Sequence, residues 1–393
     1  MAGRAARAIV AGAAAVVMTA SAVGCAGTTG GSIAADRPAG SLRRVSATAS
    51  TTTEPPAPPA NTLSMKKFTR ISGGITPKSV VASGTGLVTA QNMMYSHTVT
   101  AYDGDGKLVA TVPDSVKLSD FGIAKPGTYK GAPVEAAFTS DAKKEYVSNY
   151  SMYGPGFREG SDQCTPASKV PASFLYRIDT TTWKVDQVVP VGATPKYVAV
   201  SPDDTRVLAT NWCTWDLTIA DVATGKVQRT VQLGRYPRGI AVTKDSATAY
   251  VAVMGTSDIA KVHLADGTVS WIKGVGRGPR HLVLSPDGAS LYATLNAEGA
   301  VAKIDTATDT VVKKVSTGKQ PRSMAISRDG TAVYVVNYES NNVSKLDAAD
   351  LHEIQKVPSG QHPIGIAYDD STGRVWVANY SGTIDVYDEA AAA

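Results

Sequence analysis

The sequence predicts an all-β protein, a seven-bladed β-propeller built from four-stranded blades. The first observation is a repeat, because prolines stand at five positions spaced 42 residues apart: Pro195, Pro237, Pro279, Pro321 and Pro363. A glycine precedes each of these prolines by three residues. A constant period of this size is typical of stacked structural units that bury their apolar faces against one another. The second observation is that each unit contains several short β-like runs and no segment with helical spacing.

The unit that begins at Pro195 shows the strand pattern most clearly. Its four runs are separated by polar or glycine-containing turns and cover Tyr197–Val200, Arg206–Asn211, Leu217–Ala220 and Lys226–Leu233. They are rich in Val, Ile, Thr and Tyr, and Ser, Pro, Asp and Gly separate them. Four strands in 42 residues is the size of one propeller blade.

Counting outward from these repeats gives seven blades. Pro77 and Pro133 open two earlier units, and the last unit, which starts at Pro363, lacks a fourth strand. The segment Lys66–Gly74 ends in a glycine three residues before Pro77, as the fourth strands do elsewhere. We therefore expect this N-terminal strand to complete the last blade, which would leave no exposed sheet edge. The propeller is predicted to cover residues 65–389.

The second runs of several units carry a resemblance to a known family. Tyr334-Val335-Val336-Asn337, Trp376-Val377-Ala378-Asn379 and Tyr146-Val147-Ser148-Asn149 resemble the tyrosine-valine-threonine-asparagine motif of the YVTN family of seven-bladed β-propellers. Blades four and five depart from the motif, with Val253 and Leu295 in place of the asparagine and His263 in place of a third-strand aspartate. The resemblance implies the fold. It says less about function, because members bind or hydrolyse different things.

The N-terminus predicts export. Residues 1–24 have Arg4 and Arg7 before an apolar stretch, as a secretory signal does. The segment Ala22–Cys25 resembles a bacterial lipobox, which predicts lipidation of Cys25. Ala22 stands where leucine is usual, so cleavage by an ordinary signal peptidase stays open. A plain transmembrane anchor is disfavoured because the apolar stretch is short.

A tether is predicted to follow this signal. Residues 25–64 are dominated by Gly, Ser, Thr, Ala and Pro, a composition that cannot bury enough apolar surface to fold. We therefore expect an extracytoplasmic domain, lipid-anchored to the outer face of the bacterial cytoplasmic membrane.

Two cysteines remain if Cys25 carries lipid. Cys164 and Cys213 lie in the second-to-third-strand loops of blades two and three, and adjacent blades place such loops side by side. In an oxidising compartment this predicts a disulfide. The alternative is two free thiols. A metal site is disfavoured because no histidine lies near either cysteine in the sequence.

One face of the propeller is predicted to carry recognition. Both long insertions, Asp114–Lys130 and Tyr150–Ser173, belong to connections on the same face. The residue after each landmark proline opens an innermost strand at the channel mouth of that face, and five of these seven residues are basic: Lys78, Lys196, Arg238, Arg280 and Arg322. Converging on one axis, they would favour an anionic ligand. The alternative is that they are solvated or paired with carboxylates of loops.

Aromatic residues follow the motif asparagine in four blades, at Tyr150, Trp212, Tyr338 and Tyr380. They could stack on sugars or bases. The alternative is that the asparagine bonds backbone groups while the aromatic ring covers the blade end, and we favour that alternative for the tyrosines. Trp212 and the nearby Trp215 are the better ligand-binding candidates.

Enzyme motifs give little signal. No zinc-protease, nucleophile-elbow or phosphate-loop pattern stands in a credible context. Glu135 and His281, which lie next in line on the innermost strands of blades two and five, are the candidates for acid–base catalysis. We expect no metal and no cofactor.

Three functions stay open. The first is a monomeric binding protein for an anionic small molecule, a cell-wall polymer or a surface protein. The second is a lactonase-type hydrolase using Glu135 or His281, which the family resemblance implies. The third is single-stranded nucleic acid binding, which the net charge of +5, two units of it from Arg4 and Arg7, does not favour.

Overall fold

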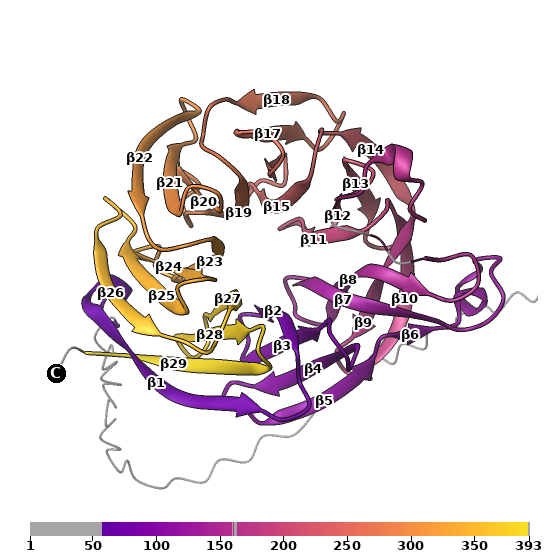
Figure 1. Cartoon of the computed structure of the whole chain (residues 1–393), viewed down its shortest axis with the longest axis horizontal. Coiled ribbons are helices and arrows are strands. Elements are labelled where there is room, and N and C mark those ends of the chain that lie inside the picture. Colours follow the sequence, from indigo (N-terminus) through magenta and orange to yellow (C-terminus); the bar gives the residue numbers. More distant parts are fainter. Residues whose placement is uncertain (1–56, 159, 161–162, 392–393) are drawn as a thin grey trace, which may run out of the picture. The chain divides into compact units, whose positions relative to one another are not determined.

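Seven antiparallel sheets surround a central axis in the computed structural model, which describes residues 57–158, 160 and 163–391 (Figure 1). The predicted seven-bladed β-propeller is confirmed. The predicted signal, the lipidation site at Cys25 and most of the predicted tether lie outside the described residues. None of the helices in the described part of the chain is long and apolar enough to cross a membrane.

The strands run from the channel outward in each of the first three blades. Blade one is β2 (Pro77–Ala82), β3 (Leu87–Asn92), β4 (Thr98–Asp103) and β5 (Leu108–Pro113). Blade two is β7 (Tyr129–Phe138), β8 (Lys144–Tyr153), β9 (Ser173–Asp179) and β10 (Lys184–Val191), with β6 (Ser115–Val116) added beside β7. Blade three is β11 (Pro195–Val200), β12 (Arg206–Asn211), β13 (Asp216–Asp221) and β14 (Val227–Gln232).

The next three blades repeat this order. Blade four is β15 (Pro237–Val242), β16 (Thr248–Val253), β17 (Asp258–His263) and β18 (Val269–Ile272). Blade five is β19 (Pro279–Leu284), β20 (Ser290–Leu295), β21 (Ala300–Asp305) and β22 (Thr310–Ser316). Blade six is β23 (Pro321–Ile326), β24 (Ala332–Asn337), β25 (Asn342–Asp347) and β26 (Glu353–Pro358).

Blade seven joins the two ends of the propeller. It is β27 (Pro363–Asp369), β28 (Arg374–Asn379), β29 (Thr383–Ala391) and, outermost, β1 (Leu63–Ser72) from the N-terminal side (Figure 1). The predicted closure by an N-terminal strand is therefore present, and β1 begins at Leu63. Three short 3-10 helices complete the described structure: η1 (Ala60–Thr62), η2 (Leu118–Phe121) and η3 (Pro166–Ser168).

Blade two differs from the predicted four strands by the addition of β6. In this strand Ser115 lies opposite Lys130 and Val116 opposite Tyr129. Both β6 and η2 come from the first predicted insertion. Val116, Leu118 and Tyr129 are buried in one apolar cluster with residues of β8 to β10, so this insertion is packed against the blade.

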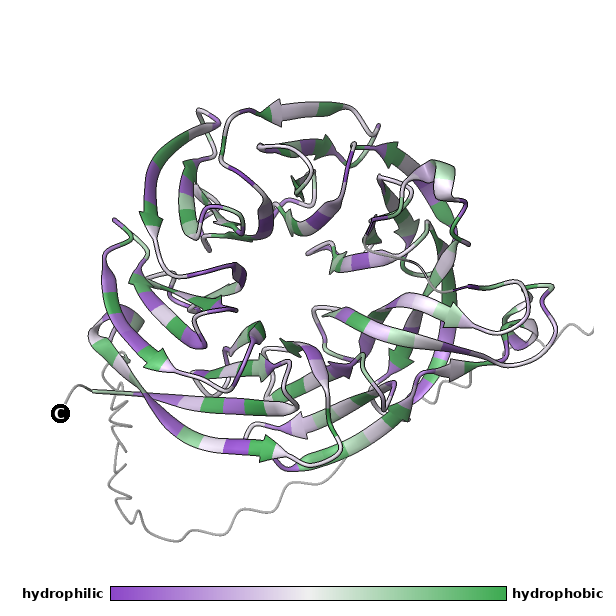
Figure 2. Cartoon of the chain, in the orientation of Figure 1, coloured by the Kyte–Doolittle hydropathy of each residue, from purple (hydrophilic) through white to green (hydrophobic). Residues whose placement is uncertain are grey.

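The core lies between neighbouring blades. The second strands are largely buried, and in β24 all six residues are buried. Side chains of blades four and five interlock in one cluster that includes Tyr250, Ala252, Leu291 and Leu295. The outermost strands β22 and β26 carry recurring hydrophilic residues that face solvent (Figure 2). Blades thus pack against their neighbours, and exposed residues gather on the outermost strands, where Val312 is exposed as well.

The motif asparagines bond side chains of the neighbouring strand, whereas the structural alternative expected bonds to backbone groups. Asn211 Nδ2 donates to Asp216 Oδ1 at 2.6 Å and to Thr218 Oγ1 at 2.8 Å, and Asn337 makes the corresponding bonds in blade six. These bonds tie the second strand to the third within the blade. Val253 and Leu295, which replace the asparagine, are buried in apolar clusters instead. The two departures therefore leave the blade architecture intact.

A buried ion pair holds the closing segment. Lys345 Nζ, on β25, donates to the carbonyl oxygens of Ala60 at 2.6 Å and Leu63 at 2.8 Å. It also contacts Glu389 Oε1 at 2.5 Å, and the two charged side chains are 0% and 3% exposed. The ammonium of Lys345 thus connects blade six to both strands that close blade seven.

We expect Lys345→Ala to lower the free energy of unfolding by about 3–5 kcal/mol, because the substitution leaves the Glu389 carboxylate buried without its cation. Chemical denaturation of the full chain measures this change. Lys313→Ala, at an exposed lysine on β22, is the control and should change the stability by less than about 0.5 kcal/mol. Adding Glu389→Gln to Lys345→Ala should recover part of the loss. Equal midpoints for Lys345→Ala and the control would contradict the role given to the ion pair.

Candidate ligand-binding site at the channel mouth

A break in the strand pairing follows each landmark proline and positions the basic residues. In blade three Pro195 pairs with Asn211 and Tyr197 pairs with Thr210, so the strand register shifts at Lys196. The same irregularity skips Lys78 in blade one and Arg322 in blade six, and wider ones skip Arg238 and Arg280. Such bulges redirect side chains away from the pleat. They explain why the residue after the proline faces the channel mouth.

The five predicted basic residues line one pocket of about 280 Å³. Its described lining residues are Lys78, Met93, Tyr150, Lys196, Trp212, Arg238, Arg280, Arg322, Tyr338, Ile364 and Tyr380. Among them five are basic, four are aromatic and none is acidic. The structure therefore brings together all the sequence-predicted ligand-binding residues except Trp215. That tryptophan lies outside the pocket, in edge contact with Tyr236 at 6.4 Å between ring centroids.

Aromatic faces support several of these cations. Lys196 Nζ lies 3.8 Å from the ring centroid of Tyr150, and the Arg322 guanidinium lies 3.5 Å from that of Tyr338. Trp212 is close to both Lys196 and Arg238, at 5.1 and 5.9 Å. A cation over an aromatic face gains electrostatic attraction without losing its charge. Three of the aromatics after the motif asparagine, Tyr150, Trp212 and Tyr338, thus contact the basic residues.

Lys78 is the most deeply desolvated member. Its side chain is buried, and its Nζ atom has no hydrogen-bond partner among the described residues. Burial and the positive charge of Arg238 hold the pKa of Lys78 well below its ordinary value, while Glu135 acts in the opposite direction. A buried ammonium without a partner is costly, so the presence of Lys78 at this position lowers the free energy of unfolding.

A collar of residues in left-handed backbone conformation surrounds the pocket. The residue just before the landmark proline has a positive φ in five blades: Thr194, Tyr236, Gly278, Gln320 and His362. Residues before proline normally avoid this region, and so do bulky side chains. Tyr236 stacks on Trp212 with ring centroids 4.4 Å apart, and His362 stacks on Tyr338 at 4.6 Å. Gln320 Oε1 accepts a hydrogen bond from Arg322 at 2.8 Å. The collar thereby fixes the side chains that hold the cations.

Neither the collar nor Met93 was singled out from the sequence. The collar had a usable signal, since its members stand at one fixed position of the repeat. Met93 follows Asn92, the equivalent of the motif asparagine in blade one, and so occupies the place that the aromatics occupy elsewhere.

The predicted disulfide is confirmed. Cys164 and Cys213 are bonded, with their Cα atoms 5.1 Å apart. Both cysteines pack in one buried cluster with Ala193 and Trp212. The bond therefore ties the long insertion of blade two to the tryptophan that forms part of the pocket wall.

A second layer of polar residues lies along the channel next to the ring. Ser79, Glu135, Tyr197, His281 and Ser323 line a cavity of about 210 Å³. His281 Nδ1 accepts a hydrogen bond from the Met324 backbone N–H at 3.2 Å, and its Nε2 lies 2.8 Å from the Tyr197 hydroxyl. The ring proton therefore belongs on Nε2. Burial and the charges of Arg280 and Arg238 lower the pKa of His281 to about 3, so the imidazole stays neutral.

Glu135 is the second catalytic candidate of this layer. Burial raises the pKa of Glu135, while the charges of Lys78, Arg238 and Arg280 act to lower it. Among the described residues, Glu135 and His281 are not hydrogen-bonded to each other. The two candidates share one cavity but do not form an acid–base pair in this arrangement.

A hydrogen-bond chain leads from this layer into the wall between blades one and two. The Ser79 hydroxyl donates to Gln91 Oε1 at 2.5 Å, and Gln91 Nε2 donates to Glu145 Oε1 at 3.1 Å. Thr89 also donates to Glu145, whose Oε2 atom has no partner among the described residues. Burial raises the pKa of Glu145 to about 7, although these hydrogen bonds act in the opposite direction.

Comparisons with known proteins support the fold. The model of the family described as "Cytochrome D1 heme domain" matches residues 247–381, which is 135 of the 393 residues. A solved chain described as hydrazine synthase of Kuenenia stuttgartiensis is similar at 17% identity, with a TM-score of 0.65, over 82% of this chain and 98% of that one. No curated protein matches the chain. Fold and site together define a seven-bladed β-propeller with a basic, aromatic-lined channel mouth.

We expect Lys78→Met to stabilise the protein and to weaken anion binding at the same time. Removing a buried ammonium of depressed pKa should raise the free energy of unfolding by about 1–2 kcal/mol. Thermal unfolding without ligand measures the first effect, and the loss of stabilisation by phosphate or glucuronic acid measures the second. Lys313→Met is the control for the change of side chain. A lowered melting temperature would show that Lys78 is instead satisfied within the fold.

The stability of the protein should fall between about pH 4.5 and pH 7 because of Glu145. The folded-state pKa of this group is raised from 4.5 to about 7, so its contribution is fully present below pH 4.5 and is lost as the pH rises through 7. Glu145→Gln should remove this fall and add up to about 3 kcal/mol at pH 8. Denaturation at a series of pH values tests it, with Asp120→Asn at an exposed site as control. An unchanged pH profile in Glu145→Gln would rule out the assignment.

Proposed function

We propose that the protein is an extracytoplasmic, lipid-anchored binding protein that captures an anionic ligand at the channel mouth. The observation that carries the proposal is Lys78. Its buried Nζ atom lies without a hydrogen-bond partner, among the described residues, in a pocket that four further basic side chains line. A carboxylate or phosphate oxygen is the partner that such a group lacks, and charge-assisted hydrogen bonds are among the strongest in proteins.

The pocket suits the charged end of a ligand. A volume of about 280 Å³ lies just below the range of about 300–1,000 Å³ that is usual for small-molecule sites. The basic residues come from blades one, three, four, five and six, so their fields add at one point near the axis. An acidic small molecule, the acidic unit of a polymer or a carboxylate of a partner protein can place its anion there.

The N-terminal sequence supports the cellular location in this proposal. The signal-like residues 1–24, the lipobox-like Ala22–Cys25 and the Pro-, Ser- and Thr-rich segment after it are the features of a tethered lipoprotein. The disulfide between Cys164 and Cys213 agrees with an oxidising compartment. Membership of the YVTN family belongs to the same proposal and is supported by the motif residues of blades two, six and seven.

The partial match to the heme-domain family suggests heme binding, but the residues of this site do not fit a heme. Heme iron takes His, Cys, Met or Tyr as its protein ligand. Within the described residues the one histidine that lines the channel cavities, His281, has both ring nitrogens in hydrogen bonds, and Cys164 and Cys213 are in the disulfide. The mouth pocket does contain Met93 and three tyrosines, but the rings of Tyr150 and Tyr338 lie against Lys196 and Arg322. The mouth pocket is also small for a macrocycle. The proposed function therefore does not include heme.

The hydrolase alternative gains no specific support. A general base needs an unprotonated atom aimed at substrate, and in His281 the Nδ1 lone pair is already used by the Met324 N–H. Glu135 remains the one carboxylate in the described cavity lining, where it offsets part of the charge of the basic ring. Binding without turnover is the function that this geometry favours.

Anion titrations of the full chain test the proposal. Isothermal calorimetry with inorganic phosphate, malate and glucuronic acid should show saturable binding of at least one of them. Arg238→Gln and Arg280→Gln should each weaken it about 10- to 100-fold, since a charge-assisted hydrogen bond contributes about 1.5–3 kcal/mol. The control Lys313→Gln should leave the affinity within twofold. Absence of binding by every anion, or equal affinities in the two arginine variants and the control, would refute the proposal.

A further inference from the structure

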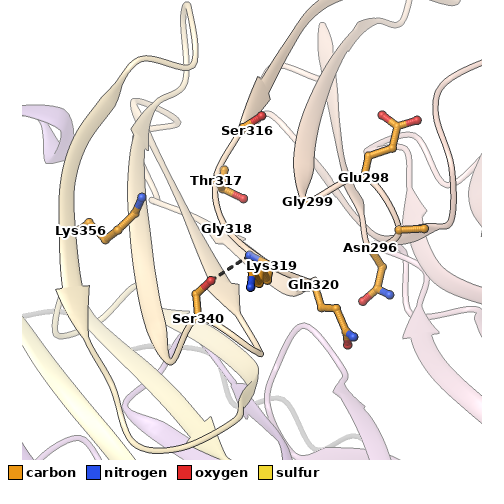
Figure 3. A pocket seen from close by; sticks show the side chains of 11 residues that line it. Asn296, Glu298, Gly299, Ser316, Thr317, Gly318, Lys319, Gln320, Ser340 and Lys356 are labelled. Atoms are coloured by element: carbon orange, nitrogen blue, oxygen red, sulfur yellow. Dashed lines mark hydrogen bonds between the residues drawn. The ribbon is translucent and has the colours of Figure 1, made fainter.

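A polar groove lies between blades five and six, beside the candidate pocket. It has a volume of about 850 Å³ (Figure 3). Three segments form it: the β20–β21 turn at residues 296–299, the link from β22 to β23 at residues 316–320, and Ser340 with Lys356 of blade six. These turns belong to the same kinds of connection that carry the channel-mouth residues.

Hydroxyl and amide groups dominate the lining of this groove. They come from Asn296, Ser316, Thr317, Gln320 and Ser340 (Figure 3). The Asn296 Oδ1 atom is buried and accepts no hydrogen bond from the described residues. A buried acceptor without a donor is unfavourable, so this oxygen suits a donor supplied by a ligand.

The charged groups of the groove are largely compensated, with one exception. Glu298 pairs with Lys314 at 3.3 Å, and Lys356 pairs with Glu353 at 2.8 Å. Lys319 is exposed, and its backbone N–H donates to Ser340 Oγ at 2.9 Å, which fixes the chain at the groove floor (Figure 3). The groove therefore offers many neutral hydrogen-bonding groups and two exposed lysines, of which Lys356 is paired with Glu353.

The groove and the pocket meet at Gln320. Its Oε1 atom accepts from Arg322, which lines the pocket, while Gln320 itself lines the groove. Ser340 in the groove and Tyr338 in the pocket belong to the same turn of blade six. A ligand of sufficient length can therefore occupy both.

We infer that the groove binds the neutral sugar units of an acidic oligosaccharide whose acid group lies in the channel-mouth pocket. This inference rests on the proposed function and adds the class of ligand. Sugar hydroxyls both donate and accept, which matches a lining of amides and hydroxyls. The volume of the groove falls within the range of small-molecule sites. A peptide groove would need apolar side chains, and among the described lining residues Ala297 is the only apolar one with a side chain.

Three ligands separate the two subsites in calorimetry of the full chain. They are glucuronic acid, neutral xylotriose, and the acidic tetrasaccharide in which one glucuronic acid is attached to three xylose units. In the unmodified protein the tetrasaccharide should bind at least tenfold tighter than glucuronic acid. The double variant Asn296→Ala, Lys319→Ala should lose this factor and keep its affinity for glucuronic acid within twofold. Lys313→Ala is the charge-matched control and should behave as the unmodified protein.

The outcomes distinguish this inference from the proposed function. Equal affinities for glucuronic acid and the tetrasaccharide would overturn the sugar subsite and leave anion capture standing. Binding of phosphate or malate, with no binding of glucuronic acid or the tetrasaccharide, would also overturn the sugar subsite and leave anion capture standing. Arg280→Gln should weaken both sugar acids alike, and a tetrasaccharide that binds Arg280→Gln unchanged would place the ligand away from the pocket and overturn the inference. A double variant that retains the tenfold factor would also overturn it.

Discussion

The bulge that follows the landmark proline is the local feature on which the candidate site depends. Proline cannot donate a ladder hydrogen bond, and in every blade the pairing register shifts directly after it. The shift takes the next residue out of the alternation between the two sheet faces. A regular strand would have sent Lys196 or Arg322 into the packing between blades. The bulge brings these side chains to the axis, where five of them meet.

Concentrating charge in this way opposes stability, and the surrounding residues limit the cost. Burial and, after it, the nearby charge of Arg238 depress the pKa of Lys78, so a positive charge at this place is unfavourable. Tyr150, Trp212 and Tyr338 place aromatic faces against the charges, and the Arg280 Nε donates to the Arg322 carbonyl at 3.1 Å. Two collar residues, Tyr236 and His362, stack on Trp212 and Tyr338 and have a strained backbone conformation. Strain that recurs at one position of the repeat and converges on one pocket is the pattern expected of a binding site.

The repeat allowed much of this architecture to be predicted. The 42-residue period predicts the strand order and the position of the post-proline residue in the later blades. The landmark Pro77 and Pro133 and the glycine before Pro77 extend this prediction to the first two blades and to the closure by β1. Features that break the repeat could not be derived. The strand β6 arises from an insertion without a counterpart, and the Tyr197–His281 hydrogen bond joins blades three and five across the channel. Trp215 follows Trp212 by three residues, yet the left-handed backbone at Trp215, with φ at 62°, turns it to the outside of the pocket.

The ring is not symmetric, and its asymmetry would orient the ligand that we propose. Blades two and seven carry Val134 and Ile364 where the others carry cations, and these blades flank Lys78 on both sides. Ile364, Met93 and Tyr380 make the side of the pocket at blades seven and one the less polar one, whereas Lys196, Arg238, Arg280 and Arg322 form a continuous basic arc over blades three to six. An anion is drawn toward that arc. The polar groove opens between blades five and six, within the same arc, so a molecule held by its acid group has its remaining units next to hydroxyl and amide groups. A symmetric ring would bind an anion equally well but could not favour one direction for the rest of the ligand.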